Sequence, residues 1–423
     1  MKNPLTLLAS MMLAAGSLTA TAASLDITAF YAPSATNPEN NSFTITTPEA
    51  GFCKSWPIYC TGDAKSVDIK NLTLKGNGIL RASDSTPKNN FFLSLPKNTP
   101  VTLVNSTSGQ TIQAKFEITH FHAAWTQLTG GGVKGWENGS FVYPSKNTTC
   151  YSANGSSSVG SGDGSSNTTY RWGWTVSGGN CFKLNTLASR DISSSKLKDI
   201  IIRYKLITVS PLLLEPGEYT GYVDWSIGPD GNISFGNKWD ASDSMLRVNF
   251  SLNVNHELKL TTTAEDQQVS LQPCASGKVC SADEGAANWE RWMITRITPE
   301  LSGRSRFNLT SSGAFTVYVQ CEHQSGQDCA LRSDNTPSQT VPVQSLLTLP
   351  QNILDVSTGS TVSKRRLATS KDLNKNIFVS NSYGQNRAGH IDFLVSQKDV
   401  DTMLKTRPDT YRGAVTVIID PKL

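Results

Sequence analysis

The sequence predicts an all-β chain that is organised in two halves. Short segments of alternating apolar and polar residues recur along its 423 residues, separated by clusters of Gly, Asn, Ser and Pro. Charged residues make up only 17% of the chain, and segments with helical periodicity are scarce. A chain of this length is expected to form two or more domains.

Residues 1–22 have the features of a secretory signal peptide. Lys2 gives a positive start, residues 5–16 (LTLLASMMLAAG) form a short apolar region, and 20–22 (ATA) match a small-x-small cleavage site. The mature chain is therefore expected to start near Ala23 and to be exported. No other stretch approaches the roughly 18 apolar residues of a membrane span.

The cysteine content agrees with export. An even number of cysteines in an exported chain favours disulfides over metal, and no Cys-x-x-Cys motif occurs. Connectivity stays open at this point, but pairing in sequence order would give two local bridges in each half. The eight cysteines fall as Cys53 and Cys60, Cys150 and Cys181, Cys274 and Cys280, and Cys321 and Cys329.

The first half contains the longest alternating segments. Residues 67–76, 111–121, 199–209 and 219–227 are predicted strands. A turn at 228–231 (GPDG) follows the last of these, and 232–235 (NISF) is expected to return as its partner, so that 219–235 forms a hairpin.

A domain boundary is predicted where the strand at 245–254 ends. Its apolar face alternates with a polar face, and the pattern is interrupted near Asn255 and His256 before it resumes. We therefore expect an N-terminal domain at 23–254, a linker at 255–257 and a C-terminal domain at 258–423.

The second half suits an immunoglobulin-like β-sandwich, with about seven short strands separated by turn signals. One short helix is expected at 396–406. The predicted strands include 292–297, 314–321, 342–350, 376–381, 390–396 and 411–420.

The terminal strand has no later segment to pair with. Val415, Val417 and Ile419 lie on one face and are expected to line a groove or the sandwich interior. The pattern favours an incomplete domain that lacks its last strand. The alternative is a complete domain in which an earlier strand covers this edge.

Catalytic and metal signatures are absent from the sequence. It contains no G-x-S-x-G, H-E-x-x-H or P-loop motif, so an enzyme is not expected. His120 and His122 lie two apart on a strand, but no nearby Cys, Asp or Glu completes a metal set. They are predicted to be unliganded surface histidines. The net charge of +4 does not suggest a nucleic-acid partner.

Three segments resemble a known family. Residues 211–236 (PLLLEPGEYTGYVDWSIGPDGNISFG), 311–331 and the closing YRGAVTVII are similar to minor tip adhesin subunits of alternate chaperone–usher fimbriae, the colonization-factor-antigen and cable-pilus tip proteins. The similarity extends along most of the mature chain and is weakest at 40–200.

This resemblance implies two tandem β-sandwiches at the tip of a fimbria on the bacterial cell surface. The first would bind a host receptor, which is expected to be a glycan, and the second would be an incomplete pilin fold. A periplasmic chaperone would lend the missing strand, and at an outer-membrane usher the major pilin's N-terminal strand would replace it. No cofactor is implied.

The receptor contacts predicted on this basis come mainly from arginines, since a guanidinium can bind a carboxylate of an acidic sugar through two hydrogen bonds. The candidates are Arg171, Arg190, Arg81 and Tyr170. Trp172 and Trp174 lie on the opposite face from Arg171 and are expected in the core. Two other functions remain open: a structural tip subunit without a receptor, and a secreted carbohydrate-active enzyme.

Overall fold

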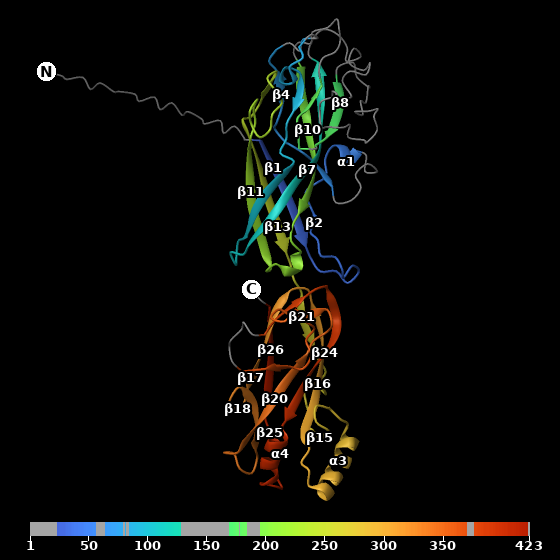
Figure 1. Ribbon diagram of the computed structural model, residues 1–423, viewed down its shortest axis with the longest axis vertical. Coiled ribbons are helices and arrows are strands. Elements are labelled where there is room, and N and C mark those ends of the chain that lie inside the picture. The colour runs from blue at the N-terminus through green and yellow to red at the C-terminus, as the bar shows by residue number, and fades with distance from the viewer. Residues whose placement is uncertain are drawn as a thin grey trace, which may run out of the picture.

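The chain folds almost entirely as strands in two curled bodies, which confirms the predicted all-β class (Figure 1). The computed structural model describes residues 23–55, 64–78, 81, 84–127, 169–176, 178–183, 195–369 and 376–421. The predicted signal peptide lies outside these residues. Within them, no helix is both long and apolar enough to cross a membrane.

The first body is built on an 11-stranded sheet in the order β12-β4-β10-β7-β6-β11-β13-β1-β2, with β3 also on β10 and β8 also on β7. Among the described residues, the first body also contains a two-stranded sheet, the helix α1 (Phe52–Ser55) and two 3-10 turns, Pro87–Asn89 and Pro211–Leu213. The strands of the large sheet are β1 (Ala23–Tyr31), β2 (Thr44–Ile45), β3 (Lys65–Asp68), β4 (Leu74–Gly76), β6 (Asn98–Asn105), β7 (Thr111–Gln127), β8 (Thr169–Thr175), β10 (Ser195–Ile207), β11 (Gly217–Ser226), β12 (Trp239–Ala241) and β13 (Met245–Val254). The small sheet pairs β5 (Phe91–Leu93) with β9 (Cys181–Lys183).

The predicted alternation of β13 is confirmed, because its apolar face is buried from Leu246 to Val254. The predicted hairpin at 219–235 is wrong. Residues 232–235 do not form an antiparallel partner of β11: Ile233 makes only an isolated parallel bridge to Ile227, and its amide donates to the Ser226 carbonyl at 2.9 Å. Ser234 instead bridges to Ser94. The turn itself forms, with the Gly231 amide donating to the Gly228 carbonyl at 3.2 Å.

The second body is a sandwich of two sheets around its own core. The larger sheet has the order β14-β16-β24-β20-β19-β18, with β15, β22 and β25 attached, and the smaller has the order β21-β23-β17-β26. The larger comprises β14 (Leu258–Thr261), β15 (Gln272–Cys274), β16 (Glu300–Ser311), β18 (Gln324–Ser325), β19 (Asp328–Ser333), β20 (Thr340–Thr348), β22 (Arg365–Leu367), β24 (Gly384–Val395) and β25 (Tyr411–Arg412). The smaller comprises β17 (Ala314–Cys321), β21 (Ile353–Asp355), β23 (Ile377–Ser380) and β26 (Val415–Pro421).

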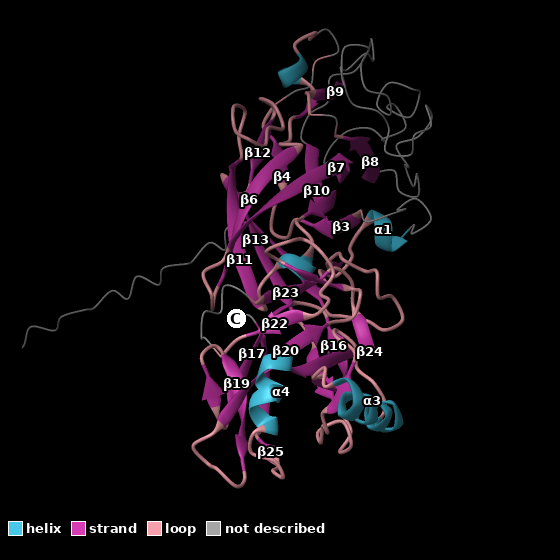
Figure 2. Cartoon of the chain, turned by 60° about the horizontal axis from the view of Figure 1, so that its bottom comes forward, coloured by secondary structure: helices cyan, strands magenta, loops and turns pink. Residues whose placement is uncertain are grey.

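Two helices lie at the end of the second body that is far from the first (Figures 1 and 2). The short helix α4 (Gln397–Leu404) confirms the helix expected at 396–406. The strand predicted at 292–297 is wrong, because its first residues end the helix α3 (Ala282–Thr295). Ser281 and Glu284 form a capping box that starts this helix, and a buried position at Gly285 fixes it on the sheet.

Disulfides fix loops in both bodies. Cys274 bonds to Cys280 and Cys321 bonds to Cys329 in the second body. In the first body, Cys53 and Cys181 each take part in a disulfide. The cysteines expected to pair with these two, Cys60 and Cys150, lie outside the described residues.

Residues 255–257 connect the two bodies and are held on both sides. The His256 Nε2 donates to the Leu214 carbonyl at 2.8 Å, and its ring meets Tyr31 edge-on. The next residue, Glu257, accepts a hydrogen bond of 2.8 Å from the Tyr383 hydroxyl of the second body. The Tyr383 amide in turn donates to the Pro38 carbonyl of the first. The short linker is thus anchored to both bodies.

Candidate functional site

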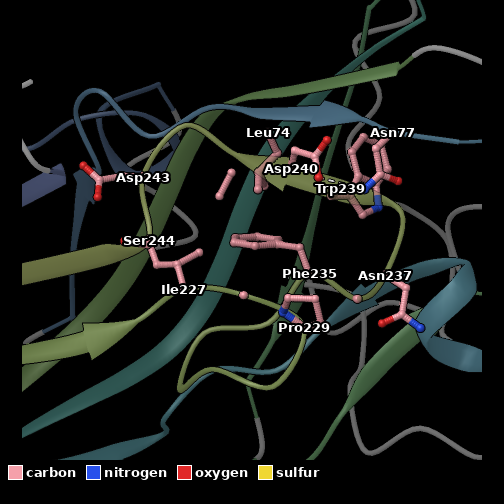
Figure 3. Close-up of a pocket in the computed structure, with 13 residues that line it drawn as sticks. Leu74, Asn77, Ile227, Pro229, Phe235, Asn237, Trp239, Asp240, Asp243 and Ser244 are labelled. Carbon is pink, nitrogen blue, oxygen red and sulfur yellow. Dashed lines mark hydrogen bonds between the residues drawn. The ribbon is translucent and has the colours of Figure 1, made fainter.

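A pocket of about 250 Å³ opens in the first body beside β4 and β12 (Figure 3). Its apolar floor is made by Leu74, Ile227, Phe235 and Trp239, and in the figure the Phe235 and Trp239 rings point into it. Trp239 is on β12, which pairs with β4 through Trp239 and Gly76. Both rings are almost fully buried, so they shape the pocket more than they offer an exposed stacking face.

Polar groups form the rim of this pocket. The Asn77 side-chain amide donates to Asp240 Oδ1 at 2.8 Å, and both residues are exposed. On the other side, the Asn237 side chain donates to Asn89 Oδ1 at 3.0 Å. Asp243 lies apart from Asp240 in Figure 3, and its carboxylate accepts the Ala23 amide. An apolar floor with a rim of amides and a carboxylate suits a small polar ligand such as a sugar.

The pocket wall depends on one glycine. Gly236 has a φ of +81°, and a Cβ at this position would meet the Lys88 carbonyl oxygen at 2.5 Å. The chain can therefore turn from Phe235 towards Trp239 only without a side chain here.

Three of the four residues predicted to contact a receptor lie in the described part of the chain, on two separate segments of the sheet. Arg81 is exposed on the segment that follows β4. Tyr170 and Arg171 are on β8, where Tyr170 pairs with Trp125 and Arg171 with Ala124 of β7; their side chains are not described. Strands β10 and β7 separate β8 from β4, a distance of about 14 Å at the usual strand spacing. Arg190, the fourth candidate, lies outside the described residues.

The sequence alone did not indicate the residues that line this pocket. The segment 236–242 (GNKWDAS) concentrates Gly, Asn, Trp and Asp, a composition typical of a binding loop, but Asn77, the partner of Asp240, is 163 positions away in the chain. Only the pairing of β12 with β4 brings the two together.

A second candidate site is the edge strand β26. It pairs with β17 on one side, where Ile419 lies opposite Val317 and Val417 opposite Val319. No other strand pairs with β26 among the described residues. Directly opposite residues of an antiparallel pair share a face of the sheet. On this shared face, the β17 residues Val317 and Val319 are 1% and 2% exposed, whereas the β26 residues Val417 and Ile419 are only half-buried.

The apolar groups beside this edge remain accessible. Val415, Val417 and Ile419 all pack against the core of the second body from its margin. At the edge of the other sheet, Leu260 on β14 is 43% exposed. An apolar margin next to unpaired backbone groups is a surface to which another strand can add.

The prediction of surface histidines at 120 and 122 is wrong. His122 is 7% exposed and His120 is half-buried, and their rings stack at 6.4 Å. Burial lowers the pKa of His122 to about 3 and that of His120 to about 4. Sequence alternation placed both on the outer face of β7, but it could not show that this face is covered. Within the described part of the chain, no three His, Cys, Asp or Glu residues could hold a metal ion.

Comparisons with known proteins found similarity only among solved structures. No family model and no curated protein matches the chain. A chaperone–tip adhesin complex of CFA/I fimbriae aligns with 95% of this chain and 97% of its own, at 9% identity and a TM-score of 0.24.

Two further structures align over similar lengths. The CsuC–CsuE chaperone–tip adhesion subunit complex of archaic Csu pili from Acinetobacter baumannii covers 94% of this chain and 98% of its own, at 10% identity and a TM-score of 0.22. CfaE, the adhesive subunit of the CFA/I fimbria of enterotoxigenic Escherichia coli, covers 95% and 93%, at 9% identity and a TM-score of 0.23. Because all three TM-scores are low, these alignments carry no argument about function.

Proposed function

We propose that this protein is the adhesive tip subunit of a chaperone–usher fimbria and not an enzyme. Residues 23–254 form the receptor-binding domain, residues 255–257 the linker, and residues 258–423 a pilin domain that lacks its last strand. The observation that carries this proposal is the incomplete burial of β26. Val417 and Ile419 are only half-buried, whereas their neighbours Val319 and Val317 on β17, on the same face of the sheet, are buried.

In this proposal, two different proteins supply the missing strand, one after the other. A periplasmic chaperone first covers Val415, Val417 and Ile419, and at the outer-membrane usher the N-terminal strand of the major pilin replaces it. Main-chain hydrogen bonds to β26 supply affinity, and alternate apolar side chains set the register. The mature protein then caps the fimbria at the bacterial cell surface.

Rescue by an added strand tests this proposal. The mature chain is expressed in the periplasm alone and with an alternating apolar–polar strand fused through a turn after Leu423. A matched fusion carries the same residues in scrambled order. We expect the unfused chain and the scrambled fusion to be largely degraded or aggregated, with only a small soluble fraction, and the alternating fusion to accumulate as a monomer. A stable, cooperative unfused monomer would contradict the proposal.

The receptor is proposed to be a host-cell glycan that enters the pocket floored by Phe235 and Trp239. The Asn77 amide would donate hydrogen bonds to its hydroxyls, and the Asp240 carboxylate would accept hydrogen bonds from them. Arg81, Arg171, Arg190 and Tyr170 stay candidate contacts outside this pocket.

Binding of the stabilised chain to a glycan array and to host cells tests the receptor site. We expect Asn77→Ala and Asp240→Ala to lower binding at least tenfold, and the distant Asp224→Ala to leave it unchanged. Separate variants with alanine at Arg81, Arg171 or Arg190 show whether the arginines contribute. No binding to any glycan or cell, combined with loss of fibres when the subunit is deleted, would favour a structural tip subunit without a receptor.

A further inference from the structure

A basic cluster lies on the face of the first sheet that is turned away from the core. On β10, Ile202 and Tyr204 point into the core, so Arg203 between them points to the opposite face. On β7, Phe121 is in the core, and His120 and His122 on either side of it share the face of Arg203. The register places His120 directly opposite Arg203.

This outer face is covered by the segment that contains α1. A Cβ on Gly51 would meet the Ile201 side chain at 2.2 Å, so the segment lies directly on β10. Ser66 on β3 is opposite Arg203 on its other side, and its hydroxyl is engaged by the Ala50 carbonyl and the Cys53 amide. Arg203 is thus enclosed from two sides and is only 5% exposed.

The Arg203 guanidinium forms no ion pair with a carboxylate of the described residues. Its buried Nε has no hydrogen-bond partner, and no carboxylate of the described residues lies within 4.0 Å of it. Glu49 is close enough to raise the pKa of Arg203 slightly, but burial has the larger effect and lowers it. Burying a cation without a partner is unfavourable, so a site of this kind is normally completed by an anion.

The two histidines beside Arg203 supply no charge to this cluster. Burial lowers the pKa of His120 to about 4 and that of His122 to about 3, so both rings are neutral at pH 7. The cluster therefore carries a single positive charge, on Arg203. The His120 Nδ1 lies 3.0 Å from the Thr119 hydroxyl.

We propose that Arg203, together with His120 and His122, binds one oxyanion, the carboxylate or sulfate group of a small acidic molecule or acidic sugar. The guanidinium fork would hold two of its oxygens, and a neutral imidazole N–H would donate to it. The site lies on the flank of the first body, is separate from the Trp239 pocket, and does not depend on the role of the protein as a tip subunit.

Thermal unfolding of the full-length mature chain that carries the fused alternating strand tests this site. The probes are sulfate, acetate, glucuronate and N-acetylneuraminate, each compared with chloride at equal ionic strength, and glucose serves as the neutral control. We expect an oxyanion at ten times its Kd to raise the Tm by at least about 2 °C. A shift with sulfate and acetate indicates a free anion, and a shift with the acidic sugars alone indicates a sugar-borne carboxylate.

Two arginine variants locate the effect. In Arg203→Met the oxyanion shift should vanish, while the Tm in chloride should equal or exceed that of the wild type because the unpaired charge is gone. Arg247→Met removes an exposed arginine that pairs with Asp224, and it should retain the shift. The proposal fails if the wild type shows no shift beyond chloride, or if Arg203→Met shows the same shift.

Calorimetric titration keeps the test independent of the stability of the variants. The most effective oxyanion is titrated into the wild type and into Arg203→Lys, which keeps the charge but lacks the planar fork. We expect at least a tenfold higher Kd for the lysine variant. Equal Kd values would overturn the assignment to Arg203.

Discussion

Replacing Ile419 by alanine should lower the free energy of unfolding of the second body by different amounts in the free chain and in the chain that has received a strand. Ile→Ala removes three carbons, worth about 0.8 kcal/mol each when fully buried. Ile419 is only half-buried in the free chain, so the cost there should be about 1 kcal/mol. A strand laid beside β26 would bury it fully, and the cavity left by truncation would raise the cost to about 3 kcal/mol.

Val317 provides the matched control. It lies directly opposite Ile419 on the same face but is already 1% exposed in the free chain. Val317→Ala should therefore cost about 2 kcal/mol whether or not a strand is added. Only the variant on β26 should become more destabilising when the groove is filled.

The assay must report on the second body alone. Hydrogen exchange of the peptide that covers 314–321, measured across a urea series, gives the free energy of unfolding of β17 and its neighbours. Each variant is measured in the unfused chain and in the alternating-strand fusion. Equal costs of Ile419→Ala in the two forms would refute the reasoning that β26 is an open margin.

Three further outcomes follow from other parts of the fold. Because the folded-state pKa of His122 lies below its unfolded value of about 6.5, its stabilising contribution is present above pH 6.5 and is lost as the pH falls. In His122→Gln, the free energy of unfolding of the first body should fall less steeply between pH 6 and 4. The slope should be smaller by about 1.4 kcal/mol per pH unit, as urea unfolding at several pH values would show. Replacing both Cys321 and Cys329 by serine should lower the stability of the second body by about 2–3 kcal/mol in the same assay, because the bridge closes a loop between β17 and β19. Ser281→Ala should cost about 1 kcal/mol and increase hydrogen exchange in the first turn of α3, since it removes half of the capping box with Glu284; unchanged exchange would contradict the capping role.

The sequence predicted correctly those elements in which the alternation of apolar and polar residues matches the alternation of buried and exposed positions. The strands β11 and β13 are examples, and so is the helix α4, which begins after a serine cap. Local pattern was misleading at 292–297, where apolar residues two apart suggested a strand. Trp289 and Trp292 are three apart, contact each other on the surface of α3, and belong to a helix whose start signal is eleven residues upstream.

The candidate sites could be predicted only in part, because their geometry depends on pairings between distant segments. The three apolar residues of β26 were visible as an alternating run, and their half-burial could be seen only with β17 beside them. Asn77 directly follows β4, and Asp240 is on β12, which pairs with β4 in the folded sheet. The cover over Arg203 comes from a segment about 150 residues earlier in the chain, which no periodicity can show.

Amide hydrogen exchange in β26 is the most direct test of the central claim, that this strand is the open wall of an acceptor groove. Residues 415–421 are compared in the unfused mature chain and in the alternating-strand fusion. The account predicts that the amides of β26 that point away from β17 exchange at least about a hundredfold faster in the unfused chain, because they have no partner there. Equal protection in both forms would show that the edge is already covered and would contradict the account.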